Sequence, residues 1–189
     1  MKISVTYFLL LLHFSLSHSA SATSILPISL EQLSQKATNI IYAEAIDNTV
    51  AIDPASKQIV TYTTFNILQT IKGKAAASYK IKQLGGELKD SNTRLTVHGV
   101  PRFIAGEKYI VFLPEKSSLG FSSPLGLHQG SYSVTEVDGE QVVSNGRNLT
   151  ALTQQTHAPV MAPLAVSANN PAQARLQDFI NTVRVFNVR

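Results

Sequence analysis

Four lysines form a charge cluster in this sequence, and no acidic residue lies among them. They are Lys72, Lys74, Lys80 and Lys82. Clustered ammonium groups attract anions, so they are the predicted binding residues for an acidic protein or an anionic polymer of the cell envelope. The alternative is an ordinary amphipathic strand, because Lys80 and Lys82 alternate with the apolar Ile81. Lysine is also common on sheet edges that must resist pairing.

Histidines are the remaining metal-ligand candidates, because the chain has no cysteine. His98, His128 and His157 lie far apart, and no H-x-H or H-E-x-x-H spacing occurs. We expect surface histidines, with no metal site and no cofactor.

Motifs for covalent catalysis or phosphate binding are also absent. Ser131 follows Gly130, but the second glycine of G-x-S-x-G is missing. Most acidic residues fall in expected turns, where carboxylates are normally solvated. The Gly85-Gly86 pair alone does not make a phosphate loop. The sequence therefore predicts a protein that is not an enzyme. A small hydrolase with a dispersed active site stays open as an alternative.

The N-terminus has the order of a secretory signal peptide. Lys2 precedes an apolar run over 3–16, and Ala20-Ser21-Ala22 is an A-x-A cleavage site. We expect cleavage after Ala22, which gives a secreted or periplasmic protein that begins at Thr23. Export removes the protein from cellular nucleic acid, so no nucleic-acid partner is predicted. No later segment is long and apolar enough for a membrane span.

Local patterns predict a mainly β fold with a helix at each end. With 44% hydrophobic and only 15% charged residues, a disordered chain is excluded. Ser29 and Gln32 form a capping box for a short helix to about Ala37. Strands are expected at 39–46, 58–71, 79–84, 94–97 and 109–113, with a hairpin over 132–143 that turns at Asp138-Gly139. Turns are expected at Asp47-Asn48 and Asp53-Pro54.

These elements indicate a domain over 23–144, a small barrel of five to six strands. A Pro/Ala/Thr-rich linker or wrap should cover 145–170, and a C-terminal helix should cover 171–186. Leu176, Phe179, Ile180 and Val183 have helical spacing, so this helix should dock on the barrel.

Several motifs together resemble a group of uncharacterised exported bacterial proteins, over residues 29–143. The motifs are Ser29-Leu30-Glu31-Gln32-Leu33, Thr61-Tyr62-Thr63-Thr64-Phe65, Gln83-Leu84-Gly85-Gly86 and Pro101-Arg102-Phe103 with Gly106-Glu107-Lys108-Tyr109. The core of that group looks like the OB-type barrel of the netrin and tissue-inhibitor-of-metalloproteinases (TIMP-like) family. The resemblance implies an OB-like fold and a protease-related protein as partner. The family's inhibitors act through an N-terminal cysteine, which has no match here.

Three functional hypotheses follow. The first is an exported, non-catalytic binding protein, which predicts an exposed apolar or basic patch without a convergent polar pocket. The second is the small hydrolase, which predicts a concave pocket with titratable groups, including His98 or His128. The third is a structural component of the envelope, which predicts self-association through a strand edge.

Overall fold

The structure, a computed structural model, describes residues 26–154, 164, 166–167 and 170–188. The predicted signal peptide, its cleavage site and His157 lie outside these residues. The helices are α2 (Leu30–Lys36), α3 (Leu149–Gln154) and α4 (Leu176–Asn187), with a 3-10 turn η1 (Leu127–Gly130). The strands are β1 (Asn39–Ile52), β2 (Ile59–Lys72), β3 (Ser78–Leu84), β4 (Gly86–Leu88), β5 (Thr93–Leu95), β6 (Lys108–Leu113), β7 (Ser131–Val137), β8 (Glu140–Ser144), β9 (Val166–Ser167) and β10 (Asn170–Arg175).

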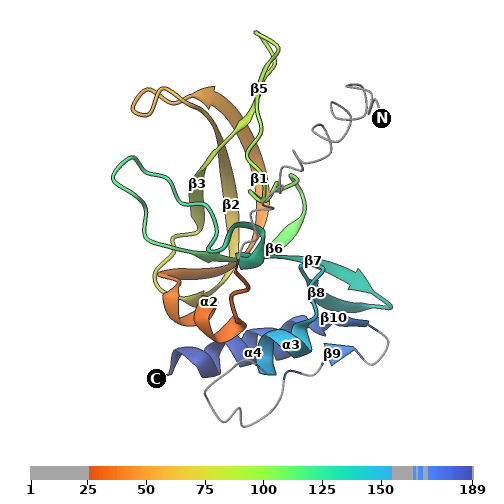
Figure 1. Ribbon diagram of the computed structural model, residues 1–189. Coiled ribbons are helices and arrows are strands. Elements are labelled where there is room, and N and C mark those ends of the chain that lie inside the picture. Colours follow the sequence, from red (N-terminus) through yellow and green to blue (C-terminus); the bar gives the residue numbers. More distant parts are fainter. Residues whose placement is uncertain (1–25, 155–163, 165, 168–169, 189) are drawn as a thin grey trace, which may run out of the picture.

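Eight strands form one antiparallel sheet in the order β3-β2-β1-β6-β7-β8-β10-β9. The predicted mainly β class, short N-terminal helix and C-terminal helix are confirmed. The predicted barrel of five to six strands is not confirmed. Among the described residues the sheet has eight strands, and β3 and β9 at its two edges do not pair with each other, so the sheet is open. β4 and β5 form a separate hairpin that reaches away from the body of the sheet (Figure 1).

The extra strands come from the region that the sequence assigns to a linker and a helix. Residues 170–175 form β10, which pairs with β8 through Ala174 and Arg175, so the helix expected from residue 171 begins at Leu176 instead. Pro171 stands at the second residue of β10, where a missing N–H is tolerated, and a proline disfavours helical backbone in the residue before it. Inside the expected linker, the Asn148 side-chain oxygen accepts from the Ala151 amide at 3.1 Å, at the start of α3.

β1 does not end at Asp47-Asn48, where a turn was expected. The strand runs on to Ile52, and the register against β2 shifts between Ala45 and Asp47. The polar pair therefore follows a β-bulge, which absorbs an extra residue without breaking the strand. The turns at Asp53-Pro54 and Asp138-Gly139 are confirmed; Asp138 and Gly139 have φ of 52° and 80°, as a tight hairpin turn requires.

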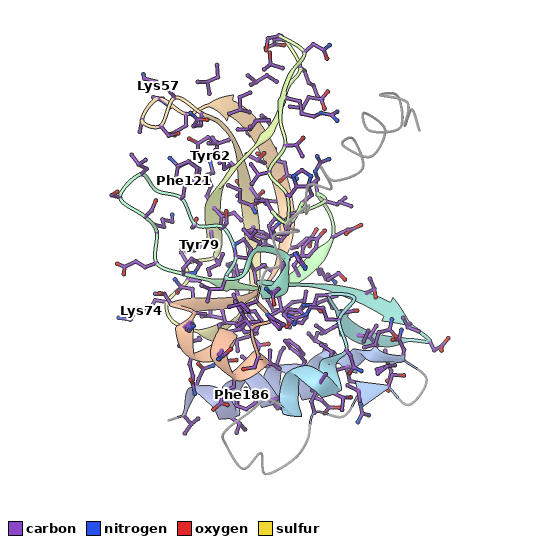
Figure 2. The ribbon with its side chains drawn as sticks, in the orientation of Figure 1. Lys57, Tyr62, Lys74, Tyr79, Phe121 and Phe186 are labelled. Carbon is purple, nitrogen blue, oxygen red and sulfur yellow. The ribbon has the colours of Figure 1, made fainter. Side chains whose placement is uncertain are left out.

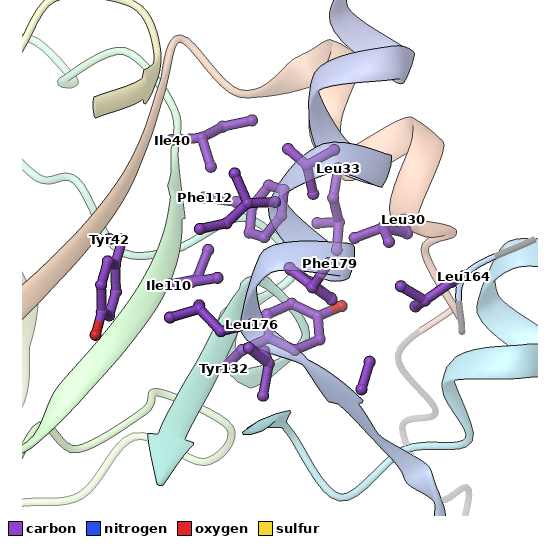
Figure 3. Packing of buried hydrophobic residues seen from close by; sticks show 14 of the residues in the cluster. Leu30, Leu33, Ile40, Tyr42, Ile110, Phe112, Tyr132, Leu164, Leu176 and Phe179 are labelled. Atoms are coloured by element: carbon purple, nitrogen blue, oxygen red, sulfur yellow. The ribbon is translucent and has the colours of Figure 1, made fainter. Parts of the chain in front are cut away.

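One core lies between the sheet and the helices (Figure 3). The predicted capping box begins α2: Gln32 N donates to Ser29 Oγ and Ser29 N donates to Gln32 Oε1, each at 3.1 Å. α2 and α4 bury their apolar sides against β1, β6 and β7. The first core contains, among others, Leu30, Leu33, Ile40, Phe112, Tyr132, Phe179 and Val183.

A second core fills the other face of β1. Successive residues of a strand point to opposite faces, so Ile40 joins the first core while Ile41 and Ala43 join the second. The second core also holds Phe65, Ile81, Phe103, Tyr109 and Val111. Among the described residues, no helix is long and apolar enough to cross a membrane.

Candidate functional site

Two of the four candidate lysines are occupied by structural contacts, and Lys82 is the clearer case. Its side chain is only 10% exposed, and its Nζ lies 2.9 Å from Asp53 Oδ1. The same ammonium group stands 4.7 Å from the centre of the Phe121 ring. Lys82 therefore holds the β1–β2 turn and the 114–126 segment against β3, and its charge is neutralised within the fold.

Lys72 is bound to the end of α2. Its Nζ donates to the carbonyl oxygens of Ser34 and Gln35, at 2.7 and 2.9 Å. A cation at a helix C-terminus satisfies carbonyls that lack partners within the helix. Partial burial lowers the pKa of Lys72 below its ordinary value. This lysine is thus part of the helix cap.

Lys74 and Lys80 are exposed, and the structure adds Lys116 to them. Lys116 Nζ lies 5.1 Å from the centre of the Tyr79 ring. Figure 2 shows Phe121, Tyr79 and Lys74 along one side of the molecule. We call Lys74, Lys80 and Lys116 the lysine side. The sequence cluster therefore divides into two structural and two exposed residues.

A cavity of about 440 Å³ opens between the sheet and the β4–β5 hairpin. Its walls come from β1, β2 and β3, from the hairpin, and from residues 96–103, which connect the hairpin toward β6. We call it the hairpin cavity. The upper parts of β1 and β2 lie beside the hairpin in Figure 1. Sequence reasoning did not find this cavity, because its walls are assembled from five separate segments.

The inner wall of the hairpin cavity is polar. Thr61 and Thr63 share one face of β2, and their hydroxyls donate to Gly85 O and Asn48 Oδ1, each at 2.7 Å. Asn48 in turn donates to Phe103 O at 2.8 Å. Gln83 Nε2 donates to Pro101 O at 3.3 Å. These bonds fix the 101–103 segment across the strands.

Two glycines let the hairpin approach the sheet. At Gly86, φ is +148° and an added Cβ would stand 2.6 Å from Val50 Cγ1. At Gly85, φ is +100° and an added Cβ would stand 2.9 Å from Leu95 O. A side chain at either position would strain the backbone and close the space, so the Gly85-Gly86 pair shapes the cavity.

Four charged or titratable side chains stand on the exposed rim of the cavity: Glu87, Arg94, His98 and Arg102. Arg94 Nε donates to Glu87 Oε2 at 3.0 Å, and a second, shorter contact joins Arg94 Nη2 to the same oxygen. The side chains of His98 and Arg102 form no hydrogen bond or ion pair with any described residue. The polar side chains of the rim that remain available are therefore those of His98 and Arg102, of which Arg102 is the cation.

The cavity meets part of the expectation for an enzyme, because it is concave and His98 lies on its rim. Covalent catalysis by a hydroxyl needs a base that takes the hydroxyl proton. The cavity hydroxyls of Thr61 and Thr63 donate instead to a peptide carbonyl and an amide oxygen, which are not bases. His128 lies in η1, outside the cavity lining. No group of three metal-ligating side chains occurs within the described residues.

Comparison of the chain with protein-family models and with curated proteins gave no match.

The sequence motifs contain Arg102 and Gln83, but sequence reasoning assigns neither residue to a site. Two features of the sequence could have indicated a role for these residues. Arg102 is a lone cation in the otherwise apolar stretch Val100–Phe103. Gln83 follows Ile81 on the same face of β3, so a polar group continues an apolar row. Both signals are weak without knowing which strand lies opposite.

Proposed function

We propose that this chain is an exported, non-catalytic binding protein whose ligand occupies the hairpin cavity. The observation that carries the proposal is the cavity itself. Its volume of about 440 Å³ falls within the range typical of small-ligand pockets, and apolar walls with a few polar groups are typical of such sites. Export rests on the signal-peptide pattern, which supports a secreted or periplasmic location.

An OB-type, TIMP-like barrel remains part of this proposal. In the strand order β3-β2-β1-β6-β7, the consecutive strands β1, β2 and β3 form a meander, and β6 pairs with the other edge of β1. This arrangement suits a partly open barrel. At the free edge of β3, Lys82 N donates to Ser122 Oγ at 3.3 Å and Ser122 N donates to Lys82 O at 3.0 Å. The 114–126 segment thus covers the edge that a closed barrel would pair. A protease-related partner rests only on the resemblance.

The test fills the cavity and follows a neutral apolar dye, Nile red. Val100 lines the cavity and is partly exposed, so V100W should occupy the space and remove most of the dye fluorescence. The control is L119W, since Leu119 is 47% exposed and lies outside the cavity lining. Circular dichroism checks that both variants fold. Equal dye binding by the two variants would contradict a ligand in the cavity.

The hydrolase alternative has its own measurement. A panel of p-nitrophenyl esters is offered to the wild type and to H98A, because His98 is the imidazole on the cavity rim. The proposal expects no turnover above the buffer rate in either protein. Turnover by the wild type that H98A abolishes would contradict the binding proposal and would show that the protein is an enzyme.

The lysine side supports a second candidate, an acidic protein or anionic envelope polymer as partner. Lys74, Lys80 and Lys116 are exposed, and their charges are not neutralised by ion pairs with described residues. Polyglutamate is a suitable probe, and the single variants K80E and K116E should each weaken its binding. The control K89E makes the same kind of charge change at the exposed turn between β4 and β5. Equal effects of these variants would show that the overall positive charge of the chain, and not the lysine side, attracts polyglutamate.

A further inference from the structure

We propose that the hairpin cavity binds an N-acylated apolar amino acid with a free carboxylate, the unit that also ends a peptide chain. This inference rests on the proposed function and names its ligand class. Three features of the cavity point to three parts of that unit: a free cation to the carboxylate, an apolar wall to the side chain, and an acceptor without a donor to the amide N–H.

Arg102 is the group that fits the carboxylate. The guanidinium has a planar fork of donors that matches a carboxylate with two parallel hydrogen bonds. Arg94 already pairs with a carboxylate on the same rim, where its Nε and Nη2 both contact Glu87 Oε2. Arg102 has no such partner among the described residues. With Glu87 and Arg94 paired, the remaining formal charge of the rim is positive, which favours an anionic ligand.

The walls fit an apolar side chain. Val50, Val97, Val100 and Phe103 line the cavity, and the three valines are only partly covered by the protein. Phe103 is held in place, because its ring packs edge-to-face on Phe65 and on Tyr109 with centroids 4.9 Å apart in each case. An apolar ligand group gains free energy by removing this surface from water.

Gln83 fits a hydrogen-bond donor. Its side chain lines the cavity but the residue is only 2% exposed, and its amide makes one hydrogen bond, from Nε2 to Pro101 O. The amide oxygen receives no donor from any described residue. A ligand N–H that reaches this oxygen gains a hydrogen bond, so a ligand with an N–H at this position is preferred over one without. An acylated amino acid carries this N–H one bond from the carbon that bears both the side chain and the carboxylate.

The experiment measures Kd for N-acetyl-leucine and two analogues by competition with Nile red and by calorimetry. N-acetyl-leucinamide lacks the carboxylate, and 4-methylpentanoate keeps the carboxylate and branched chain but lacks the amide. We expect N-acetyl-leucine to bind most tightly, by about 10-fold over the leucinamide, as befits the loss of a charge-assisted hydrogen bond. Equal affinity for these two compounds would overturn the inference.

Matched variants assign the contacts. R102Q should remove the preference for N-acetyl-leucine over N-acetyl-leucinamide, whereas E87Q/R94Q, which removes the whole ion pair on the same rim and leaves its net charge unchanged, should keep it. Q83M should remove the preference over 4-methylpentanoate. If R102Q keeps the carboxylate preference, Arg102 is not the binding group and the inference is wrong.

A further comparison distinguishes a free acylated amino acid from the C-terminus of a peptide as the ligand. Acetyl-Gly-Gly-Gly-Leu is compared with N-acetyl-leucine: tighter or equal binding assigns a peptide C-terminus, and weaker binding assigns a small acylated amino acid. Failure of this inference is distinct from failure of the proposed function. Nile red binding that V100W removes but N-acetyl-leucine does not displace would contradict the ligand class alone. Nile red binding that is insensitive to V100W would contradict the use of the cavity.

Discussion

The carboxylate of Asp53 receives its hydrogen bonds from the β1–β2 turn, from β2 and from β3. Tyr62 OH and Lys82 Nζ donate to Oδ1, at 2.7 and 2.9 Å, and the Ser56 amide and hydroxyl each donate to Oδ2 at 2.8 Å. These donors, with Tyr62 and then Lys82 contributing most, hold the pKa of Asp53 far below its usual range. The charged form of this carboxyl is therefore linked to the folded state.

A prediction about pH follows at this residue. A group whose folded pKa is depressed contributes stability above its unfolded pKa, and that stability is lost as the pH falls. The free energy of unfolding of the wild type should therefore drop as the pH falls below 3.8, the ordinary value for this carboxyl. D53N should be less stable at neutral pH and should show a shallower fall. Urea unfolding at several values between about pH 5 and pH 2 measures both slopes.

The control for D53N is E87Q. Glu87 also pairs with a cation, but its side chain is 46% exposed, and exposed pairs contribute at most about 1 kcal/mol. We expect E87Q to retain the wild-type slope. A D53N slope equal to that of the wild type would show that the acid sensitivity arises from other carboxyls.

At the scale of elements, α2 shows how a predicted binding residue becomes a structural one. The helix has only seven residues, too few for stability by itself, and both ends are satisfied by side chains: Ser29 at the N-terminus and Lys72 at the C-terminus. The capping box is local, three residues apart, and the sequence predicts it. The lysine arrives from the end of β2, and no local pattern indicates that contact.

Lys72 and Lys74, at the end of β2, should therefore respond differently to mutation. K72M removes the cation from the α2 carbonyls and should lower the free energy of unfolding by about 0.3–1 kcal/mol. K74M should change it by less, since the Lys74 side chain forms no bond with a described residue. Chemical denaturation of the two variants side by side gives the difference. Equal effects would mean that the α2 contacts do not stabilise the fold.

Most elements with a local signal lie where sequence reasoning expects them, although the turn chemistry of Asp47-Asn48 follows a β-bulge inside β1. Elements that depend on a distant partner are not predicted. β6 is an uninterrupted apolar run, and the Asp138-Gly139 turn has its own backbone signature, so both lie where predicted. β10 pairs with β8 through Ala174 and Arg175, and its sequence alone favours a capped helix. The hairpin cavity is the extreme case, because Thr61 and Gln83 lie opposite each other only once β2 and β3 pair, and Arg102 joins them from the 96–103 segment.

At the scale of the whole molecule, β1 couples the two cores. It is central in the sheet, and alternate residues bury in opposite directions, so neither core can form fully without it. Phe179 of α4 contacts Phe112 and Tyr132 in the first core, with ring centroids 6.4 and 4.8 Å apart, while Phe65 of β2 contacts Phe103 in the second. A molecule built in this way should unfold as one cooperative unit.

The test weakens each core separately. F179L and F65L should each lower the free energy of unfolding by about 1–3 kcal/mol, since each leaves a buried position underfilled. The exposed helical control V185A should change it by less than about 0.5 kcal/mol, because Val185 is 47% exposed on α4. Far-UV circular dichroism and tyrosine fluorescence should give one shared transition in both core variants. If F179L instead melts the helices while the signal of the second core persists, the two faces of β1 are stabilised independently, and the hairpin cavity could open and close without the helical side.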